Sequence, residues 1–115
     1  MTQKEMEGLI DSIFRKIQET RDAGQKEYAR KIDNAFANFE RIGKNLSLSR
    51  EKVLLVYLLK HIDGICAFVD GHTSQREDVK GRITDCIVYL CLLWGMSESH
   101  ETKYPGKSKH YTKRI

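Results

Sequence analysis

Apolar residues recur along this chain at the three- and four-residue spacing of amphipathic helices. The first such pattern follows Thr2 and Glu5, whose spacing predicts a capping box at a helix N-terminus, and Gly24 fits the end of this helix. A second pattern runs through residues 28–42. Asp33–Asn34 predicts a break in its front half, because both side chains compete for local backbone hydrogen bonds. The apolar stripe of the first helix consists of Met6, Leu9, Ile10, Ile13, Phe14 and Ile17.

A strongly apolar helix is predicted over residues 50–69, with Ser49 as its N-cap and its end near Asp70–Gly71. Its expected core face consists of Leu54, Leu58, Ile62, Ile65 and Val69. Its other side is also apolar, at Val53, Val56 and Tyr57. Because a helix that is apolar nearly all round is usually covered on both sides, we expect a homo-oligomer through this helix or a pocket walled by another helix.

The last helical pattern begins after a short loop at His72–Thr73. Ser74 and Glu77 fit a second capping box, and the helix is predicted to run to about Trp94, with Gly95 as its stop. Since the loop is short, this helix and the preceding one should pack as an antiparallel hairpin. The face expected in the core consists of Val79, Ile83, Cys86, Leu90, Leu93 and Trp94.

Length and composition fit one domain with a core of its own. The chain has 115 residues, 40% of them hydrophobic and 31% charged, with a single Pro. We predict an all-α fold of four main helices, with a single domain over residues 1–96 and a flexible basic tail over residues 97–115. The tail holds five basic and two acidic residues and so contributes most of the net charge of +4. Any weak contact with nucleic acid is therefore expected from the tail.

Two further features bear on location. No apolar run is long enough to span a bilayer, and the N-terminus lacks the pattern of a signal peptide, so we expect a cytoplasmic protein without membrane contact. Cys66, Cys86 and Cys91 lie in apolar helical stretches without a CxxC pair. They are expected to be reduced core residues, and no metal site is predicted.

The candidate chemistry lies on a stripe of the last helix formed by Asp78, Arg82, Asp85 and Tyr89. Two carboxylates one turn either side of an arginine could orient a ribose or hold a cation, and they could equally pair with Arg82 on a solvated flank. Lys60 on the preceding helix could bind phosphate, or lay its stem on apolar surface and keep its ammonium in water. No P-loop, GxGxxG or HExxH motif occurs, and no catalytic residue is assigned.

Spaced residues between positions 28 and 94 carry a family resemblance. They are Tyr28, Asn34-Ala35, Asn38-Phe39, Lys60-His61, Ile65, Glu77-Asp78 and the run from Asp85 to Tyr89. In this pattern the chain resembles small phage proteins of the nucleotide modification associated domain 1 family, which are all-α and distantly similar to MazG-like nucleoside triphosphate pyrophosphatases. The resemblance implies a nucleotide site in the cytoplasm of a host cell. The residues that would line it are Lys60, Asp78, Asp85 and Tyr89, with Asn38 and Tyr28 nearby.

The chain departs from the MazG-like pattern at the metal ligands. Those enzymes bind Mg²⁺ through a Glu-Glu-x-x-Glu motif on one helix and a Glu-x-x-Asp motif on the next. Here the corresponding helices offer Lys60, His61 and Asp63, then Arg82-x-x-Asp85. Since these are too few carboxylates for metal-dependent hydrolysis, binding is expected rather than catalysis, and no cofactor is predicted.

The sequence thus predicts a small phage-type accessory protein that binds a nucleotide or a cyclic oligonucleotide signal without turnover. Lys60 and Arg82 would bind phosphate, Tyr57 or Tyr89 would stack on the base, and Asp78 or Asp85 would bind the ribose or base edge. One alternative is a Mg²⁺-dependent pyrophosphatase that uses Glu77, Asp78, Asp85 and Glu40. Another is a protein-binding inhibitor of a host factor that docks through its first two helices.

Overall fold

Four α-helices and one π-helical turn make up the fold. The computed structural model describes residues 1–29, 33–73 and 76–103. The elements are α1 (Gln3–Gly24), the π-helical turn η1 (Gln25–Ala29), α2 (Ala37–Leu46), α3 (Arg50–Val69) and α4 (Val79–Lys103). No strand occurs within the described ranges, which confirms the predicted all-α fold. None of the helices in these ranges combines the length and the apolar character that a bilayer crossing requires.

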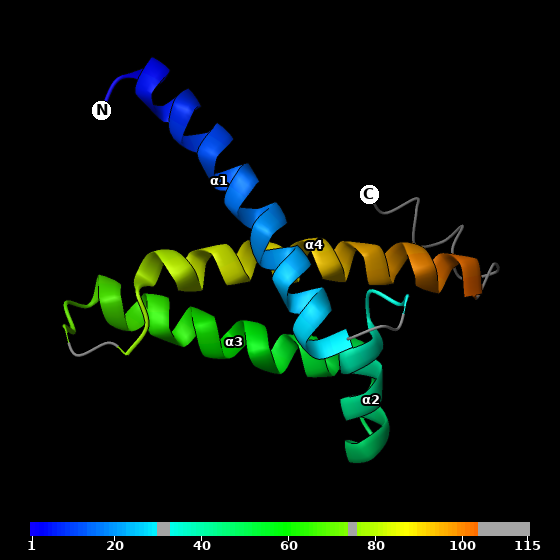
Figure 1. The fold of residues 1–115 in the computed structure, drawn as a ribbon. Coiled ribbons are helices and arrows are strands. Elements are labelled where there is room, and N and C mark those ends of the chain that lie inside the picture. Colours follow the sequence, from blue (N-terminus) through cyan, green and yellow to red (C-terminus); the bar gives the residue numbers. More distant parts are fainter. Residues whose placement is uncertain (30–32, 74–75, 104–115) are drawn as a thin grey trace.

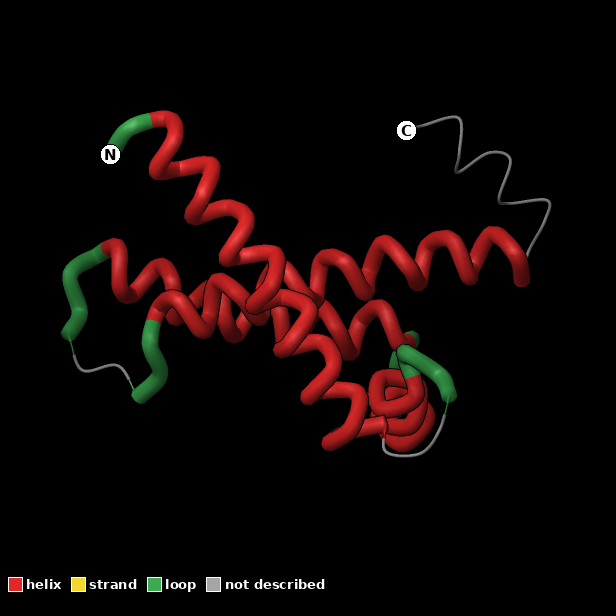
Figure 2. The backbone as a smooth tube through the Cα atoms, turned by 45° about the horizontal axis from the view of Figure 1, so that its top comes forward, coloured by secondary structure: helices red, strands yellow, loops and turns green. Residues whose placement is uncertain are grey.

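The helices α3 and α4 form the predicted antiparallel hairpin and lie side by side along most of their length (Figure 1). Helix α1 crosses α4 obliquely, and its N-terminal half projects beyond the hairpin (Figures 1 and 2). Helix α2 packs on α3 at the end of the hairpin opposite to the loop between α3 and α4. The space between the end of α1, α2 and the hairpin is therefore bounded by four elements.

Both ends of α1 lie where the sequence predicts them. The Thr2 hydroxyl accepts from the Glu5 backbone N–H at 3.1 Å, and the Glu5 carboxylate accepts from the Thr2 N–H at 3.0 Å, which confirms the capping box. Helix α1 ends at Gly24, as predicted, but without a left-handed glycine cap, because Gly24 has no positive φ and the Gln25 N–H continues to bond the carbonyls of Arg21 and Asp22. The helix widens into η1 instead.

The break predicted at Asp33–Asn34 is confirmed, since α2 begins at Ala37. The Asn34 side-chain oxygen accepts from the Phe36 N–H at 2.9 Å, and the Asn34 amide donates to Glu40 Oε1 at 2.8 Å. A side chain that bonds the backbone two residues ahead supports a turn in place of a helix. Asn34 thereby fixes the entry of the chain into α2.

Arg50, the first residue of α3, connects α2 to α4. Its Nη1 donates to Glu40 Oε2 at 2.7 Å, and its Nη2 donates to the Met96 carbonyl at 3.3 Å and to Ser99 Oγ at 3.2 Å. The guanidinium also lies over the Phe36 ring, 4.8 Å from its centroid. One side chain, 16% exposed, therefore holds three helices together at this end of the molecule.

The turn from α2 to α3 depends on a glycine. Ser47 adopts a left-handed conformation with φ 58°, and the carbonyl of Gly43 accepts from the N–H groups of Ser47 and Leu48. A Cβ on Gly43 would lie 2.5 Å from the Leu48 carbonyl oxygen, so a larger residue does not fit. The Ser49 hydroxyl then accepts from the Lys52 N–H at 3.1 Å, which confirms the predicted N-cap of α3.

Helix α3 of the hairpin ends where it was predicted to end, whereas both ends of α4 lie later in the chain than predicted. Helix α3 ends as expected, with Gly71 at φ 91°. Helix α4 begins at Val79, later than predicted, and Ser74 of the expected capping box lies outside the described residues. Gly95 does not stop α4, which continues to Lys103 across the boundary predicted at residue 96. A Cβ on Gly95 would be 3.1 Å from the Phe36 ring, so this glycine permits close packing of α4 against Phe36.

The buried core is smaller than the sequence suggests and lies where α2 meets the hairpin. Its fully packed members are Phe39, Val53, Leu54 and Met96. Val53, expected on the outer side of α3, is in this core. Outside this cluster, side chains from both predicted core faces of the hairpin are exposed. They are Ile62, Val69, Ile83, Leu90 and Trp94.

The three cysteines differ in their exposure to solvent. Cys86 is buried, as expected of a small core residue, whereas Cys66 and Cys91 are exposed. All three are free thiols. The prediction of three core cysteines was therefore wrong for Cys66 and Cys91, because no described residue covers the faces of α3 and α4 on which they lie.

Candidate functional site

A pocket of about 730 Å³ lies between the end of α1, η1, α2 and the α3–α4 hairpin. Its lining contains aromatic, cationic, amide and carboxylate side chains. Those residues are Arg21, Gln25, Glu27, Asn38, Phe39, Arg41, Tyr57, His61, Asp85 and Tyr89. Because every one of the bounding elements contributes a polar side chain, the pocket exists only in the assembled fold.

Aromatic rings form one wall of this pocket. Tyr57 and Tyr89 lie nearly parallel, with centroids 6.3 Å apart and planes at 20°. Phe39 meets both of them edge-on, at centroid distances of 6.2 Å. The His61 ring lies 5.7 Å from Tyr89. Edge-to-face and offset pairs of this kind are favourable, so the wall is held in place before any ligand enters.

The helical repeat explains which residues of the hairpin reach the pocket. Tyr57 and His61 are one turn apart on α3, and Asp85 and Tyr89 are one turn apart on α4. Residues four apart lie on one face of a helix, and the two helices pack against each other. The pair on α3 and the pair on α4 therefore face the same pocket.

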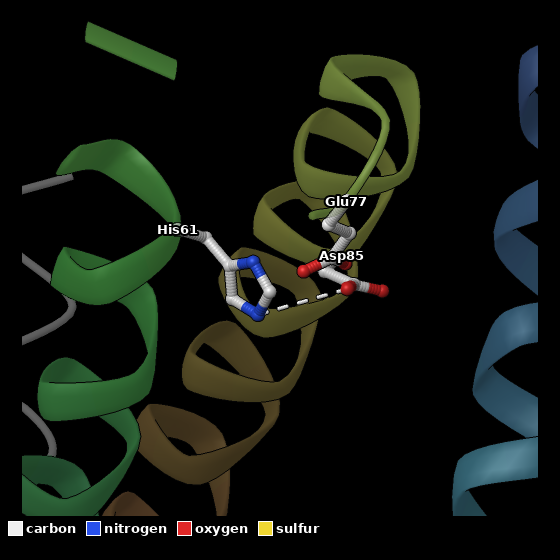
Figure 3. A group of neighbouring side chains, drawn as sticks. All are labelled: His61, Glu77 and Asp85. Carbon is white, nitrogen blue, oxygen red and sulfur yellow. Dashed lines mark ion pairs between the residues drawn. The ribbon is translucent and has the colours of Figure 1, made fainter. Parts of the chain in front are cut away.

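His61, Glu77 and Asp85 meet beside the aromatic wall, and Figure 3 shows their side chains pointing toward one another. His61 Nε2 lies 3.6 Å from Asp85 Oδ2, with side chains 15% and 29% exposed. Burial raises the pKa of Asp85; the charge of His61 offsets part of this effect, and the nearby Glu77 carboxylate raises the pKa further. The Asp85 carboxyl group therefore keeps its proton to a higher pH than an exposed aspartate does.

Arg82 is packed between the two helices of the hairpin. Its guanidinium lies directly on Gly64 of α3, where a Cβ would overlap it, and its side chain is 15% exposed. Its Nη1 is 4.0 Å from Glu77 Oε2. Its Nε is buried without a hydrogen-bond partner among the described residues. Gly64 therefore provides the room for a cation that balances the Glu77 side of the cluster.

Cys86 follows Asp85 on α4 and is buried. Burial and, to a smaller extent, the charge of Asp85 raise the pKa of its thiol. A thiol that resists ionisation is a poor nucleophile and a poor metal ligand. Cys86 is therefore a packing residue of the hairpin.

The structure brings together four of the seven side chains predicted to bind a ligand, which are Asn38, Tyr57, Asp85 and Tyr89. The other three lie elsewhere. Lys60 is exposed and does not line the pocket, and Arg82 is packed against Gly64. Asp78 lies just before α4, where its Oδ1 accepts from the Lys80 N–H at 3.3 Å. It borders a separate shallow depression near the loop between α3 and α4.

Five of the polar side chains named above were missed by sequence reasoning as ligand-binding groups, namely Arg21, Gln25, Glu27, Arg41 and His61. Arg21 and Arg41 come from α1 and α2, and no local pattern relates them to the hairpin. His61 was not assigned to the site from the sequence, although its Nδ1 is shielded from solvent. Its spacing of four residues from Tyr57 was the available signal, because it places both side chains on one face of α3.

Comparison with known proteins adds no assignment to this geometry. No family model, no curated protein and no solved structure matches the chain.

Proposed function

We propose that the protein binds a nucleotide, or a nucleotide-derived signal such as a cyclic oligonucleotide, in the pocket between α1, α2 and the hairpin, without turning it over. The observation that supports this proposal most is the combination of two tyrosine faces with two arginines in one pocket of about 730 Å³. Pockets for small ligands commonly enclose about 300–1,000 Å³ and carry a few well-placed polar groups on a mainly apolar lining.

The chemistry of a nucleotide matches the distribution of these groups. A base stacks on the face of Tyr57 or Tyr89, since stacking on aromatic side chains accepts any base. Phosphate oxygens bind Arg21 or Arg41, whose guanidinium groups can donate two parallel hydrogen bonds. Asn38 has both a donor and an acceptor for a base edge or a ribose hydroxyl. The proposal thus assigns phosphate to Arg21 and Arg41, in place of Lys60 and Arg82.

Binding is favoured over hydrolysis by the carboxylates of the pocket. Among the described residues that line it, the only carboxylates are Glu27 and Asp85, from η1 and α4. Metal-dependent phosphoryl chemistry commonly clamps the reacting oxygens between two ions, which requires more anionic ligands. Together with the resemblance to small phage proteins, this suggests an accessory protein that handles nucleotides or sequesters a host defence signal.

The test is isothermal titration of the purified chain with nucleoside mono-, di- and triphosphates and with cyclic di- and trinucleotides. Arg41→Ala should weaken the bound ligand about 10- to 100-fold, the range of a lost hydrogen bond to a charged group. Lys44→Ala is the matched control, because Lys44 is an exposed cation on the same helix and does not line the pocket. The proposal is wrong if no compound binds, or if Arg21→Ala and Arg41→Ala both bind as the wild type does.

The enzyme alternative gives a different result in the same preparation. Release of pyrophosphate from a nucleoside triphosphate with Mg²⁺, abolished by Asp85→Ala, would replace the binding proposal by a pyrophosphatase. Asp63→Ala is the control for this assay, since Asp63 is an exposed carboxylate of α3 outside the pocket.

We also propose that the chain assembles with a second copy of itself. The outward face of α3 exposes Leu55, Val56 and Leu59 at 45%, 60% and 50%. The N-terminal half of α1 exposes Leu9 and Phe14 and projects beyond the hairpin, where none of the described residues covers it (Figure 1). Identical apolar patches brought together by a two-fold axis cover each other, which supports a symmetric assembly.

A further inference from the structure

His61, Glu77 and Asp85 converge although they come from three separate places in the chain. His61 belongs to α3, Asp85 to α4, and Glu77 to the segment before α4. One ligand atom from each lies within 4.8 Å of the other two (Figure 3). The chain has brought one imidazole and two carboxylates to a common point.

The spacing of the donor atoms suits a bound ion. Two ligands of one tetrahedral ion, each at about 2.1 Å, lie about 3.4 Å apart. His61 Nε2 and Asp85 Oδ2 are 3.6 Å apart, which is too long for a hydrogen bond and close to that value. Glu77 has a 44% exposed side chain, so it can adjust its position to complete the set.

A second feature of the cluster is a ring nitrogen that no protein group satisfies. His61 Nδ1 is shielded from solvent and has no hydrogen-bond partner among the described residues. Nδ1 is separated from Nε2 by the ring carbon Cε1, so an ion held at Nε2 does not satisfy it, and the imidazole donor of the cluster is Nε2 alone. The ligand oxygens of Glu77 and Asp85 lie within 4.8 Å of each other, so the two negative charges repel. A cation between these carboxylates removes the repulsion.

We propose that His61, Glu77 and Asp85 form a binding site for one divalent transition-metal ion of the Zn²⁺ or Mn²⁺ class. An imidazole combined with two carboxylates suits borderline ions of this class, whereas Ca²⁺ and Mg²⁺ prefer oxygen ligands alone. The thiol of Cys86 is not part of the donor set. The site holds at most three protein ligands, as catalytic and ligand-binding metal sites do, which leaves a coordination position for a further group.

The open position has a consequence for the pocket, and this step rests on the proposed function. His61 and Asp85 both line the pocket as well as the cluster, so an ion there borders the ligand space. A phosphate oxygen of a bound nucleotide is then a suitable fourth ligand. Nucleotide affinity should fall about tenfold or more when EDTA removes the ion.

The metal is tested on its own, without nucleotide. Metal-free full-length protein is titrated with Zn²⁺ by calorimetry and with Co²⁺ by visible absorption, which reports ligation by nitrogen and oxygen. We expect one ion per chain and a loss of affinity of about tenfold or more in Asp85→Asn and in Glu77→Gln. Asp63→Asn is the matched control, since Asp63 is an exposed carboxylate on the same helix as His61.

The choice of variants separates a loss of metal binding from a failure to fold. Glu77 is partly exposed before α4, so Glu77→Gln should fold even if Asp85→Asn does not. Equal Zn²⁺ affinity in the wild type and Glu77→Gln would overturn the proposal and place the ion elsewhere, for example at the exposed thiols of Cys66 and Cys91. Failure of nucleotide binding with intact Zn²⁺ binding would reject the proposed function alone.

Discussion

Arg50→Met tests whether one side chain fixes α2 against the hairpin and thereby forms the pocket. Arg50 donates to Glu40 at 2.7 Å, to the Met96 carbonyl at 3.3 Å and to Ser99 Oγ at 3.2 Å. A hydrogen bond between charged groups contributes about 1.5–3 kcal/mol, and one to a neutral acceptor about 1 kcal/mol. Since the Glu40 side chain is 40% exposed, we take the lower value for that pair.

The free energy of unfolding should therefore fall by about 3 kcal/mol in Arg50→Met, because methionine keeps much of the apolar stem but none of the donors. For a domain of this size that corresponds to a decrease of about 10 °C in Tm. Urea unfolding followed by far-UV circular dichroism measures the first quantity, and a thermal scan measures the second. Arg50→Lys keeps the charge without the forked donors and should lose about half as much.

Two results would refute this reasoning. A loss below about 0.5 kcal/mol in Arg50→Met would show that the contacts contribute no more than an ordinary surface ion pair. A double-mutant cycle with Glu40→Gln should give a coupling energy of about 1–2 kcal/mol, and a coupling near zero would show that the two side chains act independently. If the account holds, Arg50→Met also weakens ligand binding, because Asn38 and Arg41 of α2 then lose their fixed position.

Three further predictions concern the core, the thiols and the assembly. Leu54→Ala should lower the free energy of unfolding by about 3 kcal/mol in a urea titration, since Leu54 is fully buried; a loss below about 1 kcal/mol would contradict the described core. Cys66 and Cys91 should react with iodoacetamide at pH 8 in the folded protein, whereas Cys86 should react only after unfolding, because burial raises the pKa of its thiol. Mass spectrometry of the labelled peptides measures this difference. Rapid labelling of Cys86 in the folded protein would be inconsistent with its burial. Val56→Glu should convert the assembly to monomers in light scattering after gel filtration, and an unchanged mass would exclude the outward face of α3 as the interface.

The parts of the fold that were predictable depend on neighbours in sequence. The capping box at Thr2 and the N-cap at Ser49 involve residues three positions apart, so their signals are local. Gly95 shows where such signals fail. A glycine that ends a helix and a glycine that admits a neighbouring ring look alike in sequence, and only the packing of Phe36 distinguishes them.

The sequence predicts which side chains of the candidate site share one face of a single helix. It does not predict which side chains from different helices meet in the pocket. Asp85 and Tyr89 share a helical face, so their common orientation follows from the repeat of α4. Arg21 and Arg41 reach the pocket only because α1 crosses the hairpin and α2 packs on α3. Lys60 was also predicted to bind the ligand, yet its side chain is exposed to solvent and does not line the pocket.

The central claim is that a nucleotide binds between α1, α2 and the hairpin. The most direct measurement is a crystal structure of the protein with the compound that binds most tightly in calorimetry. The account predicts a phosphate oxygen within about 3 Å of a guanidinium of Arg21 or Arg41, and a base on the face of Tyr57 or Tyr89. A compound bound at the Lys60 side of α3, with this pocket empty, would contradict it.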